Sequence, residues 1–260
     1  MRIATWNVNS IKAHLEQVSQ WVKAEKPDVL CLQEIKCEDQ GFPAPVFEEL
    51  GYNCAVHGQK TYNGVAILSR FSIESVTKGL DGDVNDDHAR FLVSTILDGE
   101  KAVRVACLYL PNGNPAPGPK FDYKLRWMER LRTWALKEMQ SEEPLVLAGD
   151  FNVIPAAVDA KNPKAWETDA LFLPETRAAF DWLQYIGFTE AFRSLHPDEP
   201  GHYSFWDYQA GAWPKNNGIR IDHLLLSPQA ADLLQSARIH CDQRGSEKPS
   251  DHVPVEIVLT

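Results

Sequence analysis

The sequence lacks an excess of positive charge: 26 Lys and Arg residues stand against 36 Asp and Glu residues, so the formal net charge is −10. Proteins that coat nucleic acid by bulk attraction need clustered basic residues to neutralise phosphates, and the composition excludes that class. It does not exclude an enzyme with a carboxylate-rich metal site, because the local field around a site matters more than the summed charge.

Cysteine is also scarce. The five cysteines are scattered, odd in number and without CxxC spacing, and two of them, Cys31 and Cys107, lie in strongly apolar strand candidates. Disulfide frameworks and zinc sites have more regular spacings. We therefore expect reduced thiols that fill space in the core.

Long apolar runs, repeats and linkers are missing as well. No run approaches the roughly 20 residues of a membrane span, and Met1 to Trp6 already reads as a buried strand, which leaves no room for a signal sequence. The sequence shows no short-period repeat and no Ser/Gly-rich linker. With 260 residues and 44% hydrophobic content, we expect one domain over residues 1–260, in the cytoplasm and without membrane contact.

What is present is an alternation of strand and helix patterns. Three helices are expected: one from the spacing of Ile11, Leu15, Val18 and Val22 behind a Ser10 cap, one after Pro119, and one over Arg177 to Ile186. Eight strands are expected at Arg2 to Trp6, Asp28 to Gln33, Val65 to Arg70, Phe91 to Leu97, Val103 to Leu110, Pro144 to Ala148, Arg220 to Ser227 and Val253 to Leu259. The mixture predicts an α/β sandwich with mixed sheets and outer helices.

Polar residues follow five of these strands at the carboxyl end, where α/β sheets usually present ligand sites. A sixth group, Asp251-His252, precedes the last strand. Taken singly, each has a plainer explanation as a turn former, a surface carboxylate or a structural histidine. Their conjunction favours a site. The five strand ends carry Asn7-Val8-Asn9, Gln33-Glu34, Tyr109-Leu110-Pro111-Asn112, Gly149-Asp150-Phe151-Asn152 and Ile221-Asp222-His223.

These residue types suit phosphodiester hydrolysis. Mg²⁺ prefers oxygen ligands, which the carboxylate of Glu34 and the amide of Asn7 can supply. An aspartate positioned by an amide neighbour, as Asp150 is by Asn152, can orient and deprotonate a water molecule.

Negative charge develops on the phosphate oxygens in the transition state. Hydrogen-bond donors such as Tyr109, Asn152 and His252 can stabilise that charge. The histidine needs a carboxylate that fixes its tautomer and raises its pKa, and Asp222 is the candidate.

Seven motifs resemble, in order, those of the exonuclease III family of abasic-site endonucleases, within the endonuclease/exonuclease/phosphatase superfamily. The resemblance runs from Arg2 to Leu259. It implies a four-layered, DNase I-like α/β sandwich of two stacked mixed sheets flanked by helices. The motifs are Trp6-Asn7-Val8-Asn9, Gln33-Glu34-Ile35-Lys36, Tyr62-Asn63-Gly64-Val65-Ala66-Ile67, Tyr109-Leu110-Pro111-Asn112, Gly149-Asp150-Phe151-Asn152, Arg220-Ile221-Asp222-His223 and Ser250-Asp251-His252.

The resemblance also implies an activity. It implies hydrolysis of the DNA backbone 5′ to abasic sites, leaving a 3′ hydroxyl, together with 3′→5′ exonuclease and 3′-phosphatase activity. The implied cofactor is Mg²⁺, with Mn²⁺ able to replace it, and the implied partner of a monomeric enzyme is double-stranded DNA with abasic sites or 3′ ends. The general base and the number of metal ions stay open.

Residue roles follow from the same motifs. The resemblance places Tyr109, Asp150, Asn152, Asp222 and His252 in catalysis. It places the metal at Asn7, Glu34, Asp150, Asn152 and Asp251.

Substrate contacts are expected at Lys60, Tyr62, Asn112, Phe205, Ile219, Arg220 and Ile221. Of these, Phe205, Ile219 and Ile221 would line an apolar pocket for a flipped-out abasic sugar, which is cheaper to extrude than a paired nucleotide. Alternatively, Phe205 and Trp206 are ordinary core aromatics. If the bulky segment Leu171-Phe172-Leu173 intrudes on the pocket, abasic cleavage weakens while 3′-end trimming survives.

Basic residues after Pro119 and before Asp222 form an expected DNA-binding rim: Lys120, Lys124, Arg126, Arg130, Arg132, Lys215 and Arg220. For the helix cluster the alternative is a solvated face paired with Glu129 and Glu138. Two other functions share this catalytic core or fold: a phosphoesterase of small molecules or lipids, and a DNA-end-binding module without activity.

Overall fold

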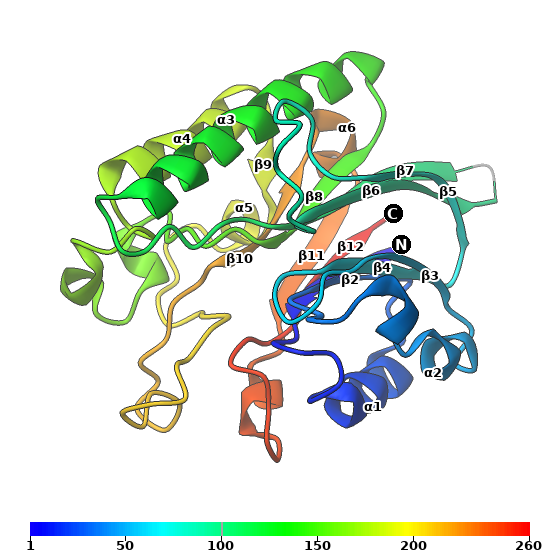
Figure 1. Ribbon diagram of the computed structural model, residues 1–260, viewed down its shortest axis with the longest axis horizontal. Helices are drawn as coiled ribbons and strands as arrows, with labels where there is room; N and C mark the ends of the chain where they lie inside the picture. Colours follow the sequence, from blue (N-terminus) through cyan, green and yellow to red (C-terminus); the bar gives the residue numbers. More distant parts are fainter. Residues whose placement is uncertain (100) are drawn as a thin grey trace.

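The computed structural model describes residues 1–99 and 101–260 and has four layers: two stacked β-sheets with helices on both outer faces (Figure 1). The first sheet has the strand order β11 (Leu234–Ile239), β12 (Val255–Leu259), β1 (Arg2–Asn7), β2 (Val29–Gln33), β4 (Val65–Ser69) and β3 (Asn53–His57). The second has the order β5 (Ser72–Lys78), β6 (Phe91–Asp98), β7 (Lys101–Tyr109), β8 (Leu145–Asp150), β10 (Asp222–Leu226) and β9 (Thr189–Glu190). The α/β sandwich expected from the sequence is confirmed.

Each sheet contains one parallel pair at its centre, β1 with β2 and β7 with β8, and antiparallel neighbours elsewhere. The carboxyl ends of a parallel pair meet at one edge, so residues that follow these four strands are brought together. In the second sheet, for instance, Tyr109 lies opposite Asp150.

Helices cover the two outer faces (Figure 1). The first sheet carries α1 (Leu15–Glu25) and α2 (Ala44–Glu48), and the second carries α3 (Pro119–Glu138) and α4 (Pro174–Tyr185). Two short helices, α5 (Ala191–Leu195) and α6 (Pro228–Ala231), flank β9 and β10, and single 3₁₀ turns lie at Asp39–Gly41, Met139–Ser141, Ala157–Asp159, Pro163–Trp166 and Cys241–Gly245. Within the described residues, none of these helices has the length and apolar character that crossing a membrane needs.

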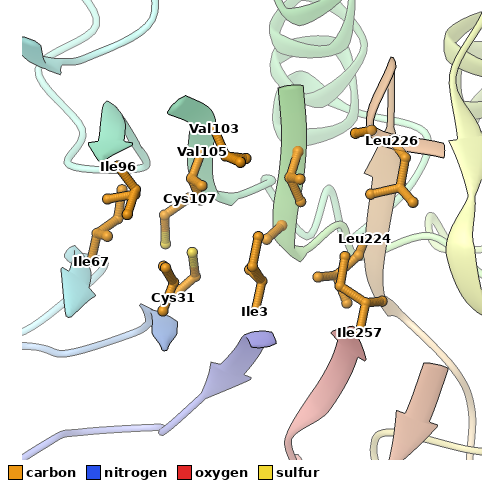
Figure 2. Close-up of a cluster of buried hydrophobic side chains, with 14 of the residues drawn as sticks. Ile3, Cys31, Ile67, Ile96, Val103, Val105, Cys107, Leu224, Leu226 and Ile257 are labelled. Atoms are coloured by element: carbon orange, nitrogen blue, oxygen red, sulfur yellow. The ribbon is translucent and has the colours of Figure 1, made fainter. Parts of the chain in front are cut away.

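The central core lies between the sheets. Branched side chains of both sheets interdigitate there, among them Ile3, Ile67, Val105, Leu224 and Ile257 (Figure 2). Cys31 of β2 and Cys107 of β7 face each other across the same layer (Figure 2). All five cysteines are free. Cys31, Cys37 and Cys107 are buried in the core, as expected, whereas Cys54 and Cys241 are half-buried.

All eight expected strands are present, with ends shifted by at most two residues. The predicted start of the first helix is wrong. The helix begins at Leu15 rather than behind Ser10, because Ser10 has a left-handed backbone (φ +90°) and its Oγ closes a turn by accepting a hydrogen bond from the N–H of Ala13 (3.3 Å).

Candidate active site

Asn7, at the end of β1, connects the two sheets. Its Nδ2 donates to Oε1 of Glu34 and to Oδ2 of Asp150, both at 2.9 Å. Its Oδ1 accepts from the backbone N–H of Asn9 (3.0 Å). Asn7 thus presents a donor to the two carboxylates and aligns them, and its role as a metal ligand stays a prediction.

His252 and Asp222 form the second buried pair of the site. Nδ1 of His252 lies 2.8 Å from Oδ2 of Asp222, and its Nε2 lies 3.8 Å from Oδ2 of Asp150. The backbone of His252 is also fixed. Nε1 of Trp6 donates to the backbone oxygen of His252 (3.0 Å), and the backbone N–H of His252 donates to Oγ of Ser250 (3.3 Å).

The sequence suggested that Asp222 follows a strand, and this is wrong. Asp222 is the first residue of β10, which runs antiparallel to β8 and places it opposite Asp150. In an antiparallel pair, the amino end of one strand meets the carboxyl end of its neighbour. Asp222 therefore reaches the expected site from the other end of its strand.

The electrostatics of the cluster favour a charged histidine. Burial alone would lower the pKa of His252, but the charges of Asp222 and Asp150 outweigh it and raise this pKa to about 10. Burial, together with the charge of Asp222, raises the pKa of Asp150 to about 7, although His252 and the hydrogen bond from Asn7 act in the opposite direction. The two groups share one field, so they titrate as a unit.

The donor set fits a hard divalent cation. The oxygen ligands come from carboxylates: ligand atoms of Asp150 and Asp222 lie within 4.8 Å of each other, and Glu34 joins Asp150 through Asn7. The charged His252 ring lies in the same cluster but is not a ligand. Three clustered carboxylates repel one another in a buried site, which a divalent cation relieves. Asp251 lies further out, where its Oδ1 accepts from Nδ2 of Asn9 (3.2 Å).

A lysine partly neutralises the open side of this cluster. Nζ of Lys36 lies 2.9 Å from Oε2 of Glu34 and also donates to Asn9. Burial would raise the pKa of Glu34, but Lys36 and the bond from Asn7 lower it below its usual value. Glu34 is therefore ionised at neutral pH and available to a cation.

Tyr109 and Asn152 are two further neighbours of Asp150: Tyr109 lies opposite it in the register of β7 and β8, and the N–H of Asn152 donates to its Oδ1. Burial and the charges of Glu34 and Asp150 hold the pKa of Tyr109 well above its usual value, so its hydroxyl stays a donor. The guanidinium of Arg90 covers the ring at 4.7 Å. Asn152 has a left-handed backbone (φ +49°), and its Oδ1 accepts from Nδ2 of the exposed Asn112 (3.2 Å).

The residues expected to line the apolar pocket belong to one cluster. Ile219 and Ile221 are buried in it, and Phe205 packs against it with its ring 4.9 Å from that of His252. Leu171 and Phe172 reach the same cluster, as the sequence suggested they could.

Two residues expected on the DNA-binding rim are buried instead. Arg220 is 0% exposed, and its guanidinium donates to Asp159 and Glu190 at 2.8 Å each, so the prediction of a substrate contact is wrong. Lys124 is also 0% exposed and points inward from α3. In both cases a basic side chain that we expected at the surface donates hydrogen bonds to oxygen atoms inside the protein, and the sequence does not reveal those partners.

Other basic residues were expected either to bind DNA or to form a solvated helix face. Arg132 pairs with Glu129 (2.5 Å), which supports the solvated-face alternative for this residue. Arg130 is largely buried and pairs with Asp86 (2.6 Å), so it fits neither the rim nor the solvated face. Lys60 and Tyr62 are exposed on the loop before β4, and their contact with DNA stays a prediction.

Sequence reasoning missed the supporting residues Arg90 and Ser250. Arg90, the residue before β6, covers the ring of Tyr109, and no spacing in the sequence signals that contact. Ser250 connects the segment of His252 to β1, because its Oγ donates to the backbone oxygen of Asn7 (2.8 Å). Its place in a motif of the sequence does not indicate this role.

Comparisons with known proteins agree with this geometry. Residues 4–252 match the model of the Endonuclease/Exonuclease/phosphatase family. An exodeoxyribonuclease III from Haemophilus influenzae is 33% identical over 262 residues, with 98% of each chain covered. Two solved structures are similar in fold: an AP endonuclease from Archaeoglobus fulgidus (TM-score 0.94, 36% identity) and a 3′ phosphatase from Neisseria bound to a product DNA hairpin (TM-score 0.95, 37% identity). Both matches cover 100% of this chain and 99% of the other chain. The chain therefore belongs to the endonuclease/exonuclease/phosphatase family of hydrolases.

Proposed function

We propose that this chain is a Mg²⁺-dependent DNA repair phosphodiesterase that cuts 5′ to abasic sites and removes 3′-terminal phosphates and nucleotides. The observation that carries the proposal is the convergence of Glu34, Asp150 and the Asp222–His252 pair around Asn7. The DNA part rests on the relatives, which include an exodeoxyribonuclease III and a phosphatase bound to DNA.

In this proposal Asp150 orients the attacking water and accepts its proton. Asp150 suits that role by its position: its Oδ2 accepts from Nδ2 of Asn7 (2.9 Å), its Oδ1 accepts from the N–H of Asn152 (2.9 Å), and Nε2 of His252 lies 3.8 Å away. Glu34 and Asp150 would hold Mg²⁺, which supplies a positive charge next to the phosphate oxygens. Asp251 and Asn152 are further ligand candidates, and Mn²⁺ is expected to substitute.

The remaining polar groups hold the phosphate. His252, kept protonated by Asp222, would donate from Nε2 to a phosphate oxygen, and Tyr109 would donate from its hydroxyl. Asn152 and Asn112 would orient the same group from the ends of β8 and β7. Lys60 and Tyr62 would contact the DNA backbone at the exposed edge of the site.

We further propose that residues 1–260 act as one catalytic domain, as a monomer in the cytoplasm, on double-stranded DNA. A same-fold phosphoesterase of lipids or small molecules would show no affinity for such DNA. The outcome of a binding measurement with a 3′-phosphorylated duplex separates these two functions.

One observation favours a narrower function, a 3′-end-processing enzyme with little abasic-site activity. The apolar cluster beside His252 contains not only the expected wall residues Ile219 and Ile221 but also Leu171, and Phe172 packs on it. A cavity for an abasic sugar needs free space at this position. A 3′ end needs less, because a terminal nucleotide does not have to leave a continuous stack.

The test uses three labelled duplexes that carry an abasic analogue, a 3′ phosphate or a normal recessed 3′ end. We expect turnover of the second and third to require Mg²⁺, to stop with EDTA and to vanish in Asp150→Asn. Cutting of the abasic duplex at a comparable rate selects the broad function, and its absence selects the narrow one. Full activity of Asp150→Asn would refute the mechanism.

A further inference from the structure

We propose that Lys124 is a positioning residue for this hydrolysis: its buried ammonium group holds together the two loops that carry Asn112 and Asn152. The inference rests on the proposed function, because it takes these two amides to contact the substrate phosphate. Lys124 lies in the second turn of α3, and its side chain is 0% exposed. It has no access to DNA, so it acts inside the protein. Burial lowers the pKa of Lys124 to about 7, and its amino group donates hydrogen bonds in either protonation state.

The ammonium group has backbone oxygens of both loops within reach. Nζ of Lys124 donates to the backbone oxygen of Asn152 (2.6 Å) and to that of Asn112 (3.1 Å). Asn112 follows β7 and Asn152 follows β8, the parallel pair at the centre of the second sheet. An ammonium group has donors only, and charge-assisted hydrogen bonds are stronger than neutral ones. One side chain therefore fixes the distance between the two loops.

The distance between the loops sets the orientation of both amides. Nδ2 of Asn112 donates to Oδ1 of Asn152 (3.2 Å), and Nδ2 of Asn152 donates to the backbone oxygen of Leu110 (2.9 Å). The backbone N–H of Asn152 donates to Oδ1 of Asp150 (2.9 Å). Lys124 thus acts on the general-base candidate through one intervening residue.

The loop is built to lie directly on this lysine. Gly113 has a left-handed backbone (φ +91°), and a Cβ at this position would lie 2.7 Å from Cδ of Lys124. Glycine is therefore required both by the backbone and by the close approach. Burying an ammonium group costs free energy unless it is well hydrogen-bonded, and an apolar side chain of the same length would fill the space but leave two carbonyl groups unpaired.

The first experiment compares Lys124→Met, which keeps the length and removes the charge, with Lys137→Met on the exposed face of the same helix. The substrate is a duplex with a 3′ phosphate. We expect kcat of Lys124→Met to fall by about 100-fold, because small misplacements of reacting groups cost about this much, while KM changes less than about threefold. Lys137→Met should retain kcat.

Each outcome has one reading. If the wild-type protein releases no phosphate, the proposed function fails. If the wild type is active and Lys124→Met keeps kcat within about threefold of Lys137→Met, the role of Lys124 is overturned.

A double-mutant cycle separates positioning from general destabilisation. If Lys124 acts through the asparagines, Asn112→Ala combined with Lys124→Met should cost less than the product of the two single losses. A fully multiplicative loss overturns the inference. If Lys124→Met does not fold, Gly113→Ala replaces it in the cycle: it keeps the ammonium group but displaces the loop, and retention of wild-type kcat would count against the inference.

Discussion

Nδ1 of His252 lies 2.8 Å from Oδ2 of Asp222, while Nε2 of the same ring lies 3.8 Å from Oδ2 of Asp150. One imidazole therefore faces two carboxylates that lie opposite each other in the register of β10 and β8. The two carboxylates differ in role because Asp222 bonds the ring directly and Asp150 does not. The pair Asp222–His252 makes a permanent cation out of a residue that is usually neutral at pH 7.

Asp222→Asn should remove this cation. The pKa of His252 is raised to about 10 chiefly because the charges of Asp222 and Asp150 outweigh its burial. Without the charge of Asp222 the buried ring becomes neutral near pH 7 and loses its charged donor, so kcat should fall by about 100-fold or more. An NMR titration of the His252 ring in both proteins checks the cause, and an unchanged titration with reduced kcat would contradict it.

Asp150→Asn should stabilise the metal-free protein while abolishing its activity. The folded-state pKa of Asp150, about 7, lies above the ordinary value of 3.8, so ionisation destabilises the fold progressively as pH rises from 3.8 through 7. At pH 8 with EDTA, the variant should have a free energy of unfolding higher by about 2–4 kcal/mol.

With Mg²⁺ present, the wild type should be more stable to unfolding than Asp150→Asn. A ligand that binds only the folded protein stabilises it in proportion to the logarithm of its concentration over Kd. The wild type should therefore gain stability on addition of Mg²⁺, and Asp150→Asn should gain much less. Urea unfolding of both proteins, with EDTA and with Mg²⁺, measures the four values, and equal gains for both would exclude Asp150 as a ligand.

The strands that the sequence failed to predict share one property. The four missed strands, β3, β5, β9 and β11, are the edges of the two sheets. Interior strands are buried on both faces and read as apolar runs, whereas edge strands such as β5 are exposed over most of their length and read as loops. Chain pattern therefore reveals the inner strands that carry the site, but not where the sheets end.

The site was predicted in the same uneven way. Asp150 and Glu34 could be found because polar residues after apolar strands stand out, and His252 because it directly precedes the last expected strand. The buried partners could not be found, because the sequence of Arg220 or Lys124 looks like any basic surface position. Only the approach of distant segments, such as Asp159 to Arg220, gives these charges a buried partner.

Phe172→Ala should shift the substrate preference. Phe172 packs on the cluster of Ile219 and Ile221 beside His252 and lies under the guanidinium of Arg177 at 4.7 Å. Removing the ring opens space at the expected abasic pocket. We expect the ratio of abasic cleavage to 3′-phosphate release to rise about tenfold or more, the discrimination that a few methylene groups provide. Both rates come from the same duplex assay, and a constant ratio would place the pocket elsewhere.

Arg220→Ala should unfold the protein far more easily than an exposed charge deletion does. Arg220 is fully buried between Asp159 and Glu190, and its removal leaves Glu190 without its arginine and Asp159 with Arg193 alone. Breaking a buried pair in this way costs about 3–5 kcal/mol. The control is Arg70→Ala, which removes a half-exposed pair with Asp28 (3.5 Å) and should cost less than about 1 kcal/mol. Equal costs in urea unfolding would show that the buried network does not stabilise the fold.

His240 should make the stability of the protein depend on pH in mild acid. Its ring is 1% exposed and packs edge-on against Trp21 at 5.2 Å, and neither ring nitrogen has a hydrogen-bond partner among the described residues. Burial, and then the charge of Arg238, lowers the pKa of His240 to about 4. The unfolded chain, with a pKa near 6.5, binds the proton first, so stability is fully present above pH 6.5 and is lost as pH falls toward 4.

The expected loss for this single group is up to about 3 kcal/mol between pH 6.5 and 4. His240→Phe keeps the aromatic contact with Trp21 and removes the titrating group, so its free energy of unfolding should decline less over the same interval. The difference between the two curves isolates His240 from the carboxylates that also titrate in acid, because those are common to both proteins. Parallel curves from urea unfolding at several pH values would mean that the ring is already protonated in the folded protein, with Glu256, whose Oε1 lies 4.0 Å from Nε2, as its partner.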